Sequence, residues 1–220
     1  MHDVLINKKI LAKNDGIANS NRKVLKERGI FTINLMSSPG SGKTSIVEKI
    51  AELLKDRVNI AVIEGDIQTD LDTQRIAKHG VPARQINTGR SCHLDAHMIQ
   101  HTLPWLFEQG KTDLLIIENV GNMVCPAEYD LGEDIKVVVM SVTEGDDKPL
   151  KYPALFRVSR HLLINKVDLL AYTNFDMEKA KRNALAINPE LNIIATSCID
   201  GTGIGKWMEG ILTSIARIRK

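Results

Sequence analysis

Short runs of apolar, mostly β-branched residues recur along the chain, and most of them end at a glycine or a polar residue. Such runs are typical of strands that are buried on both faces of a parallel sheet. We expect strands in the first half of 30–44 and at 58–64, 81–86, 113–118, 135–142, 161–164 and 191–196. Pro82 cannot donate a backbone hydrogen bond, so it indicates either an edge strand or the start of a strand.

Between these runs, apolar residues recur every three or four positions, as they do in amphipathic helices. We expect helices at 45–55, 72–79, 94–109, 175–187 and 203–219, with Pro104 kinking or dividing the third. Strands that alternate with helices predict an α/β fold. Its sheet is mostly parallel and is covered by helices on both faces.

Residues 1–29 precede the first strand and are basic, with seven Lys or Arg against three acidic residues. Their apolar spacing predicts one or two amphipathic helices, broken near Asp15-Gly16. We expect this N-terminal helical extension to cover part of the sheet, with a partner-binding arm as the alternative. Residues 30–220 then form one domain, without a linker or an internal repeat.

Composition narrows the classes of function. The formal net charge of +2 and the aromatic content of 4% argue against a nucleic-acid partner. No apolar run approaches the roughly 18 residues that a membrane span needs. Asn7, Lys8 and Lys9 interrupt the first apolar residues, so a signal-peptide core is not expected either. We therefore expect a cytoplasmic protein, whose three cysteines are thiols or metal ligands rather than disulfides.

Residues 37–44, SSPGSGKT, lie between a predicted strand and a predicted helix, which is the context of a P-loop. Its glycines let backbone N–H groups surround phosphate oxygens, and the helix directs its positive end at the same anion. Lys43 is expected at the β- and γ-phosphates and Thr44 at Mg²⁺. The pattern's first glycine is Ser37 here. The expected nucleotide-binding residues are Ser38, Pro39, Gly40, Ser41, Gly42, Lys43, Thr44 and Ser45.

Asn165-Lys166-Val167-Asp168 follows a late strand and resembles the guanine-reading motif of GTPases. A carboxylate at Asp168 can accept hydrogen bonds from guanine N1–H and the 2-amino group, whereas adenine offers neither donor. The stem of Lys166 can lie along the base, and Asn165 can brace the loop. Ser197 and Cys198 resemble the small-residue loop that meets guanine O6. The chain is therefore predicted to bind GTP and GDP rather than ATP.

Glu118-Asn119-Val120-Gly121 occupies the position of the second switch of GTPases, with Glu118 expected to hold Mg²⁺. No glutamine follows Gly121 to orient water, so hydrolysis should be slow. Asp66, Asp70 and Asp72 are candidates for orienting water or reaching Mg²⁺, and Asp66 is favoured. For Asp70 and Asp72 the alternative is helix capping. The predicted catalytic residues are Lys43, Asp66 and Glu118.

Cys92, His93 and Cys125 lie in polar loops near the predicted nucleotide and offer thiolate and imidazole ligands suited to Zn²⁺ or Ni²⁺. A symmetric dimer would pool two such sets of three ligands. His97 and His101 could join them, although solvated or core positions are expected for both. The remaining histidines, His2, His79 and His161, are expected to be structural.

Together these segments resemble the HypB family, GTPases that insert nickel during maturation of [NiFe] hydrogenase. The resemblance rests on SSPGSGKT, EGDIQTDLD, NTGRSCHLDAHMI, IIENVGNMVCP, VTEGDDKPLKYP and NKVDL. It implies a SIMIBI-type G domain that dimerises around nucleotide, with the metal site at the dimer interface and Lys148 at the neighbour's nucleotide. A hydrogenase maturation partner protein or the hydrogenase large subunit is the implied recipient. The N-terminal cysteine cluster and histidine-rich stretch of many relatives are missing from residues 1–29.

Three other functions compete with this interpretation. A urease-activating nickel GTPase shares the P-loop, but its Cys-Pro-His metal motif is absent here. A P-loop kinase or biosynthetic ATPase would not need Asn165-Lys166-Val167-Asp168. A zinc-stabilised interaction module without turnover would not need Lys43, Thr44 or Glu118.

Overall fold

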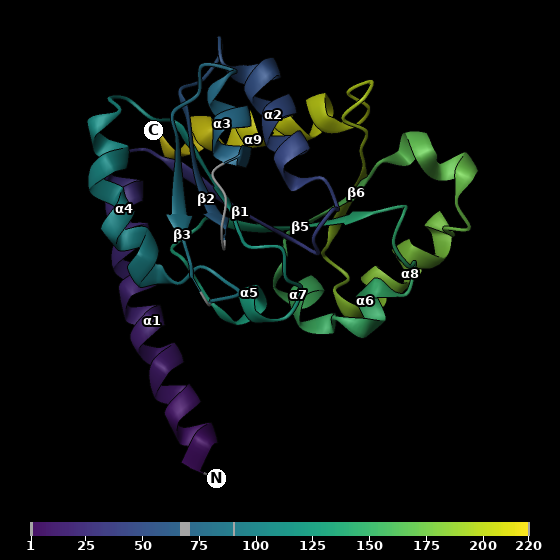
Figure 1. The fold of residues 1–220 in the computed structure, drawn as a ribbon, viewed down its shortest axis with the longest axis horizontal. Helices are drawn as coiled ribbons and strands as arrows, with labels where there is room; N and C mark the ends of the chain where they lie inside the picture. The colour runs from purple at the N-terminus through teal and green to yellow at the C-terminus, as the bar shows by residue number, and fades with distance from the viewer. Residues whose placement is uncertain (1, 67–70, 90, 220) are drawn as a thin grey trace.

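A computed structural model describes residues 2–66, 71–89 and 91–219, with side chains described from Lys9 onward. Within these residues, seven strands form one parallel sheet in the order β3-β2-β4-β1-β5-β6-β7 (Figure 1). The strands are β1 (Phe31–Ser37), β2 (Ile60–Asp66), β3 (Ala83–Asn87), β4 (Leu114–Glu118), β5 (Ile135–Ser141), β6 (His161–Asn165) and β7 (Asn192–Ala195). The predicted parallel sheet is confirmed, and so is the edge position of the strand that follows Pro82.

Helices connect the strands. The described helices are α1 (His2–Glu27), α2 (Lys43–Leu54), α3 (Leu71–Ala77), α4 (Ala96–Glu108), α5 (Cys125–Glu128), α6 (Lys148–Lys151), α7 (Pro153–Val158), the 3-10 helix η1 (Val167–Tyr172), α8 (Met177–Ile187) and α9 (Ile204–Ile218). All five helices predicted after residue 30 are present, with ends shifted by a few residues. None of the described helices is both long and apolar enough to cross a membrane.

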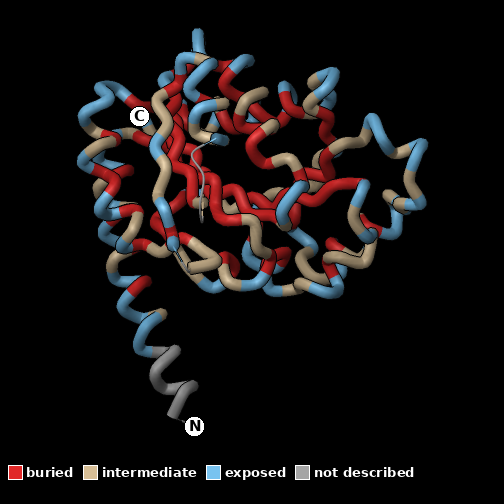
Figure 2. The backbone as a smooth tube through the Cα atoms, viewed as in Figure 1, coloured by how far each residue is buried: buried red, intermediate tan, exposed pale blue. Residues whose placement is uncertain are grey.

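The sheet lies between two apolar layers, as the fold prediction requires. On one face, Ile33 and Leu35 of β1 pack against α2 and α9. On the other face, Met36 and the inner residues of β5 and β6 pack against α5, α7 and α8, while α1 and α4 cover β2 and β4. Figure 1 shows α2, α3 and α9 on one side and α5 to α8 on the other, and Figure 2 shows the buried strands between them. Strands covered on both faces explain why their sequences are continuously apolar.

The predicted break near Asp15-Gly16 is wrong, because α1 runs unbroken from His2 to Glu27. Glycine inside a helix costs about 1 kcal/mol relative to alanine. Beyond Gly16, however, α1 buries Ala18, Asn21 and Leu25 against the domain, and this packing outweighs the local cost. The first turns of α1 extend past the body of the molecule (Figure 1).

Candidate nucleotide and metal sites

The loop between β1 and α2 has the geometry of a phosphate cradle. Gly42, which precedes α2, has φ 95°, a conformation that side chains disfavour. A Cβ atom at this position would lie 2.5 Å from Asn165 Nδ2. Glycine is therefore required here both by the backbone conformation and by the close approach of the Asn165 loop.

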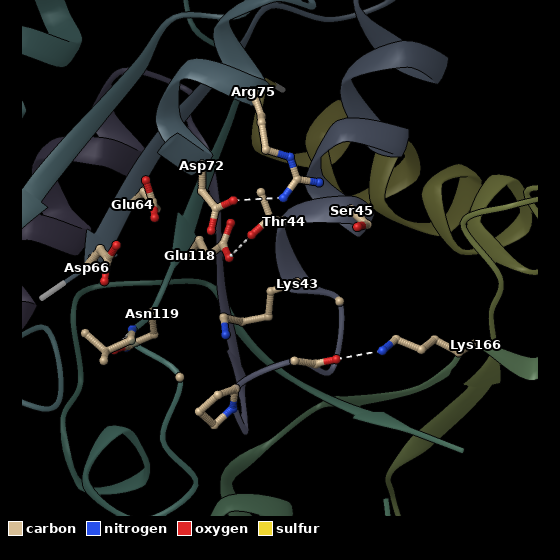
Figure 3. A pocket seen from close by; sticks show the side chains of 16 residues that line it. Lys43, Thr44, Ser45, Glu64, Asp66, Asp72, Arg75, Glu118, Asn119 and Lys166 are labelled. Atoms are coloured by element: carbon tan, nitrogen blue, oxygen red, sulfur yellow. Dashed lines mark hydrogen bonds and ion pairs between the residues drawn. The ribbon is translucent and has the colours of Figure 1, made fainter. Parts of the chain in front are cut away.

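A cavity of about 520 Å³ opens beside this loop, at the carboxyl ends of β1, β2 and β4 (Figure 3). Open α/β sheets bind ligands at this edge. The predicted site residues that line it are Pro39, Gly40, Gly42, Lys43, Thr44, Ser45, Asp66, Glu118 and Lys166. Ser38 and Ser41 are instead hydrogen-bonded to each other, with 2.9 Å between their Oγ atoms.

Lys43 and Thr44 begin α2 and point into the pocket (Figure 3). Lys43 Nζ donates to Ser37 Oγ at 2.9 Å, and burial lowers the pKa of this ammonium group. Thr44 Oγ1 donates to Glu118 Oε1 at 2.8 Å. The serine that replaces the pattern's first glycine is therefore a direct partner of the P-loop lysine.

Glu118 is suited to hold a divalent cation. Its side chain is buried at the end of β4, and its Oε2 atom has no hydrogen-bond partner among the described residues. Burial raises its pKa to about 7, because a carboxylate is harder to ionise away from water. A bound cation would favour the ionised form. Carboxylate and hydroxyl oxygens are the ligands that Mg²⁺ prefers, so Glu118 and Thr44 fit this ion.

Further carboxylates stand around the same pocket. Asp66 and Asp72 both line it, as expected for residues that reach Mg²⁺ or water. Asp72 lies inside α3, which begins at Leu71, and its Oδ1 atom accepts from Arg75 Nη1 at 2.8 Å. Asp70 lies outside the described residues.

Sequence reasoning missed three polar residues of the pocket: Glu64, Arg75 and Asn119. Glu64 pairs with Glu118 across β2 and β4, and Thr73 donates to its Oε2. Arg75 reaches Glu48 Oε2 at 2.6 Å. The signal for Glu64 and Asn119 was their position at strand ends that precede polar segments, whereas nothing in the sequence singles out Arg75.

The Asn165 loop is attached to the P-loop. Asn165 Nδ2 donates to Ser41 O at 3.0 Å, and Lys166 Nζ donates to Gly40 O at 2.7 Å. Thr196 Oγ1 and Cys198 Sγ lie 3.2 Å and 3.8 Å from Asn165 Oδ1, so the segment that contains Ser197 and Cys198 contacts this loop. Asp168 and Ser197 do not line the cavity; Asp168 is exposed and Ser197 is buried.

Lys148 lies at the start of α6, outside the lining of the cavity. Its Nζ is 3.4 Å from Glu144 Oε2, and Glu144 Oε1 accepts from Ser41 Oγ. Glu144 therefore connects Lys148 to the P-loop.

The structure brings Cys92, His93 and Cys125 together. The two Sγ atoms are 3.0 Å apart, and the ligand atoms of all three residues lie within 4.8 Å of one another. The His93 ring stacks on Tyr129 at 3.9 Å between centroids, and burial lowers the pKa of His93. A neutral imidazole with two thiols can hold a soft or borderline divalent metal.

His97 and His101 are exposed on α4 and do not belong to this cluster. Their Nε2 atoms lie 3.0 Å from each other. Of the two positions expected for these histidines, solvated or core, the structure shows the solvated one for both.

Comparison with known proteins identifies the family. Residues 31–195 match the model of the CobW/HypB/UreG nucleotide-binding domain. Over 206 residues the chain is 52% identical to the hydrogenase maturation factor HypB of Azotobacter vinelandii, covering 94% of this chain and 68% of that one. The chain belongs to the HypB family. The resemblance and the SIMIBI-type P-loop fold predicted from the sequence are thereby confirmed.

Two further relatives extend the HypB match over whole chains. A probable HypB of Methanocaldococcus jannaschii is 40% identical over 97% of this chain and 96% of its own length. The crystal structure of Helicobacter pylori HypB in complex with nickel superimposes with a TM-score of 0.89 at 40% identity, covering 93% of this chain and 96% of that chain. The match to other HypB proteins therefore extends over nearly the full length of this chain.

Proposed function

We propose that this chain is a GTP-hydrolysing metallochaperone that delivers nickel during [NiFe] hydrogenase maturation. The observation that carries the proposal is the cluster of Cys92, His93 and Cys125, whose ligand atoms lie within 4.8 Å of one another. The segments that carry these residues follow β3 and β4, at the same edge of the sheet as the nucleotide pocket. A metal site and a nucleotide site that share an edge can influence each other.

In this proposal the nucleotide pocket binds GTP. Backbone N–H groups from Gly40 to Ser45 surround the phosphates, and the positive end of α2 faces them. Lys43 balances charge that develops on the γ-phosphate, and Asp66 orients the attacking water. Asp168 accepts the two guanine donors from the Asn165 loop, with Ser197 and Cys198 near guanine O6.

Thr44 and Glu118 would hold Mg²⁺, with Asp66 as a further ligand directly or through water. When bound, this ion neutralises negative charge on the β- and γ-phosphates. The unpaired buried oxygen of Glu118 supports this assignment.

Nickel is the cargo in this proposal. Cys92, Cys125 and His93 supply three ligands from one chain, and zinc would compete for the same donors. A second copy would supply another set, so a nucleotide-dependent homodimer could complete the coordination. Lys148, which Glu144 links to Ser41 of its own P-loop, is assigned in this proposal to the neighbour's nucleotide in the dimer.

The test is to measure metal binding and hydrolysis in separate assays. Equilibrium dialysis with Ni²⁺ and Zn²⁺ should show strong binding to the parent and weaker binding to Cys92→Ala, His93→Ala and Cys125→Ala. Cys198→Ala is the matched control, because it removes the chain's third thiol from outside the cluster. These metal-site variants should all remain selective for GTP over ATP in binding assays.

Two results would contradict the proposal. Metal binding that survives in the cluster variants would place the metal elsewhere. Hydrolysis of ATP at a rate equal to or above that of GTP would indicate a kinase or ATPase instead.

A further inference from the structure

Asn119 connects the nucleotide pocket to the segment that carries Cys92 and His93. It lines the pocket directly after Glu118 and is 1% exposed (Figure 3). Its Oδ1 accepts from the backbone N–H of Leu94, the residue after His93, at 3.1 Å. A shift of Asn119 would therefore move the backbone of Leu94, next to His93.

The amide nitrogen of Asn119 begins a second series of hydrogen bonds, which ends in the segment after Cys125. Asn119 Nδ2 donates to Asn34 Oδ1 at 3.2 Å, and Asn34 Nδ2 donates to Glu133 Oε1 at 3.2 Å. Glu133 Oε2 in turn accepts from Leu131 N at 2.7 Å. Asn34 is fully buried in β1, and Glu133 is 5% exposed.

Helix α1 closes this chain of hydrogen bonds into a ring. Asn21 Nδ2 donates to Leu131 O at 3.1 Å and to Ala96 O at 2.8 Å. Ala96 lies two residues after Leu94, where the ring began. Asn14 makes a parallel link, accepting from Ala96 N at 2.9 Å and donating to Asp130 O at 2.8 Å.

Buried amides and carboxylates are costly unless they are paired, so a ring of this kind favours one relative position of the segments it joins. Here those segments are the end of β4 in the nucleotide pocket, the segment after Cys92-His93, and the segment after Cys125. We infer that the ring formed by Asn21, Asn34, Asn119 and Glu133 positions the two metal-ligand segments against the nucleotide pocket and transmits nucleotide state to the metal site. This inference rests on the proposed function.

Asn34 is the most informative member, because it lines neither the nucleotide pocket nor the metal cluster. Asn34→Val removes both of its hydrogen bonds and keeps a residue suited to a strand. Glu133→Gln is the milder second variant. Only one of the two terminal atoms of the glutamine amide is an acceptor, so this variant keeps at most one of the hydrogen bonds from Asn34 and Leu131. Asn188→Ala is the matched control: Asn188 Nδ2 donates to Phe156 O and Ser159 O, away from both sites.

The experiment measures Ni²⁺ affinity of the full chain with GDP and with a non-hydrolysable GTP analogue plus Mg²⁺, at matched oligomeric mass. The ratio of the two affinities is expected to be about 5- to 150-fold in the parent and in Asn188→Ala. It should fall to within about twofold of unity in Asn34→Val, and at least partly in Glu133→Gln. The double variant should lose no more coupling than Asn34→Val alone, because both changes break the same connection.

Three outcomes would overturn the inference. An unchanged ratio in folded Asn34→Val and Glu133→Gln would show that the ring does not carry the coupling. An equal loss of affinity in both nucleotide states would show a structural role only. A parent that binds nickel and hydrolyses GTP with a ratio of one would remove the coupling itself, while leaving the two proposed activities intact. If Asn34→Val does not fold, Glu133→Gln decides.

Discussion

The ammonium group of Lys43 is buried at the start of α2, where Ser37 Oγ accepts a hydrogen bond from it. Burial lowers its pKa, while the nearby Glu118, Asp72 and Glu64 favour the charged form. Because its position is fixed in this way, the ammonium group can stabilise negative charge on a phosphate without first rearranging.

Lys43→Ala should therefore reduce GTP hydrolysis by at least about 10²-fold, because it removes the cation that balances γ-phosphate charge. Phosphate release under single-turnover conditions measures this loss. Lys55→Ala, at the exposed far end of α2, is the control and should hydrolyse GTP at the parent rate. Parent-like release by the Lys43 variant would remove it from the proposed mechanism.

Asp168→Asn should lose at least about tenfold in GTP affinity, because the amide presents a donor where guanine needs acceptors. Xanthine nucleotides, which offer an acceptor in place of the 2-amino group, should gain affinity. Titration with labelled GDP and XDP tests both expectations. Asp56→Asn, in the exposed turn after α2, should change neither affinity. Unaltered GDP binding in the Asp168 variant would refute the guanine assignment.

Local motifs were enough to predict the P-loop residues and the Asn165 loop, because the residues of each motif are consecutive in the sequence and share one loop. Glu64 and Asn34 could not be predicted in this way. Glu64 enters the pocket because β2 pairs with β4 so that Glu64 lies beside Glu118. Asn34 joins a buried network because β1 adjoins β4. Such partners depend on strand order, which the apolar pattern leaves open.

At the scale of elements, α1 shows tertiary packing overriding a local signal. Gly16 lies within the helix, and a Cβ at this position would meet nothing within 4 Å among the described atoms. The helix persists because its second half packs on α4 and the sheet.

Gly16→Ala should therefore stabilise the protein by about 0.5–1 kcal/mol, since alanine loses less backbone freedom in a helix. Urea denaturation of the GDP-bound protein measures the change, with nucleotide and nickel affinities expected to match the parent. A decrease in the free energy of unfolding would mean that α1 is not helical at Gly16 in solution.

The contact between β6 and α9 should make stability depend on pH. Trp207 Nε1 donates to His161 Nδ1 at 2.6 Å, which requires that nitrogen to be unprotonated. Burial, with repulsion from Arg160, lowers the pKa of His161. The folded state thus binds fewer protons than the unfolded state, so this stabilisation is complete above the unfolded pKa of about 6.5 and is lost as pH falls below it.

The expected loss from this one group is at most about 1.4 kcal/mol per pH unit. Urea denaturation at several pH values between 7.5 and 5 should show a steeper decline for the parent than for His161→Leu. Parallel pH profiles for the two proteins would show that His161 does not titrate with folding.

Long elements were predicted from sequence more completely than short ones. The strands and the five longer helices after residue 30 follow from apolar runs and periodicity. The four-residue helices α5 and α6 do not, because a single turn has too few residues for a period to emerge. Cys125 begins α5, so its approach to Cys92 depended on a local structure that the sequence pattern did not predict.

At the scale of the whole molecule, one edge of the sheet carries both sites. The segment after β4 first lines the nucleotide pocket and then reaches Cys125, and the segment after β3 carries Cys92 and His93. An element in contact with both ligands can be biased by either one, and the resulting coupling must be reciprocal. The central claim is therefore that nucleotide state and metal affinity are linked, with the homodimer favoured by GTP.

The most direct measurement is a pair of nickel titrations, one with GDP and one with a non-hydrolysable GTP analogue and Mg²⁺, at matched oligomeric mass. The account predicts affinities that differ by about 5- to 150-fold, or a different number of ions per dimer. Superimposable titrations in the two states would contradict it, leaving a GTPase and a metal site that share one edge of a sheet without communicating.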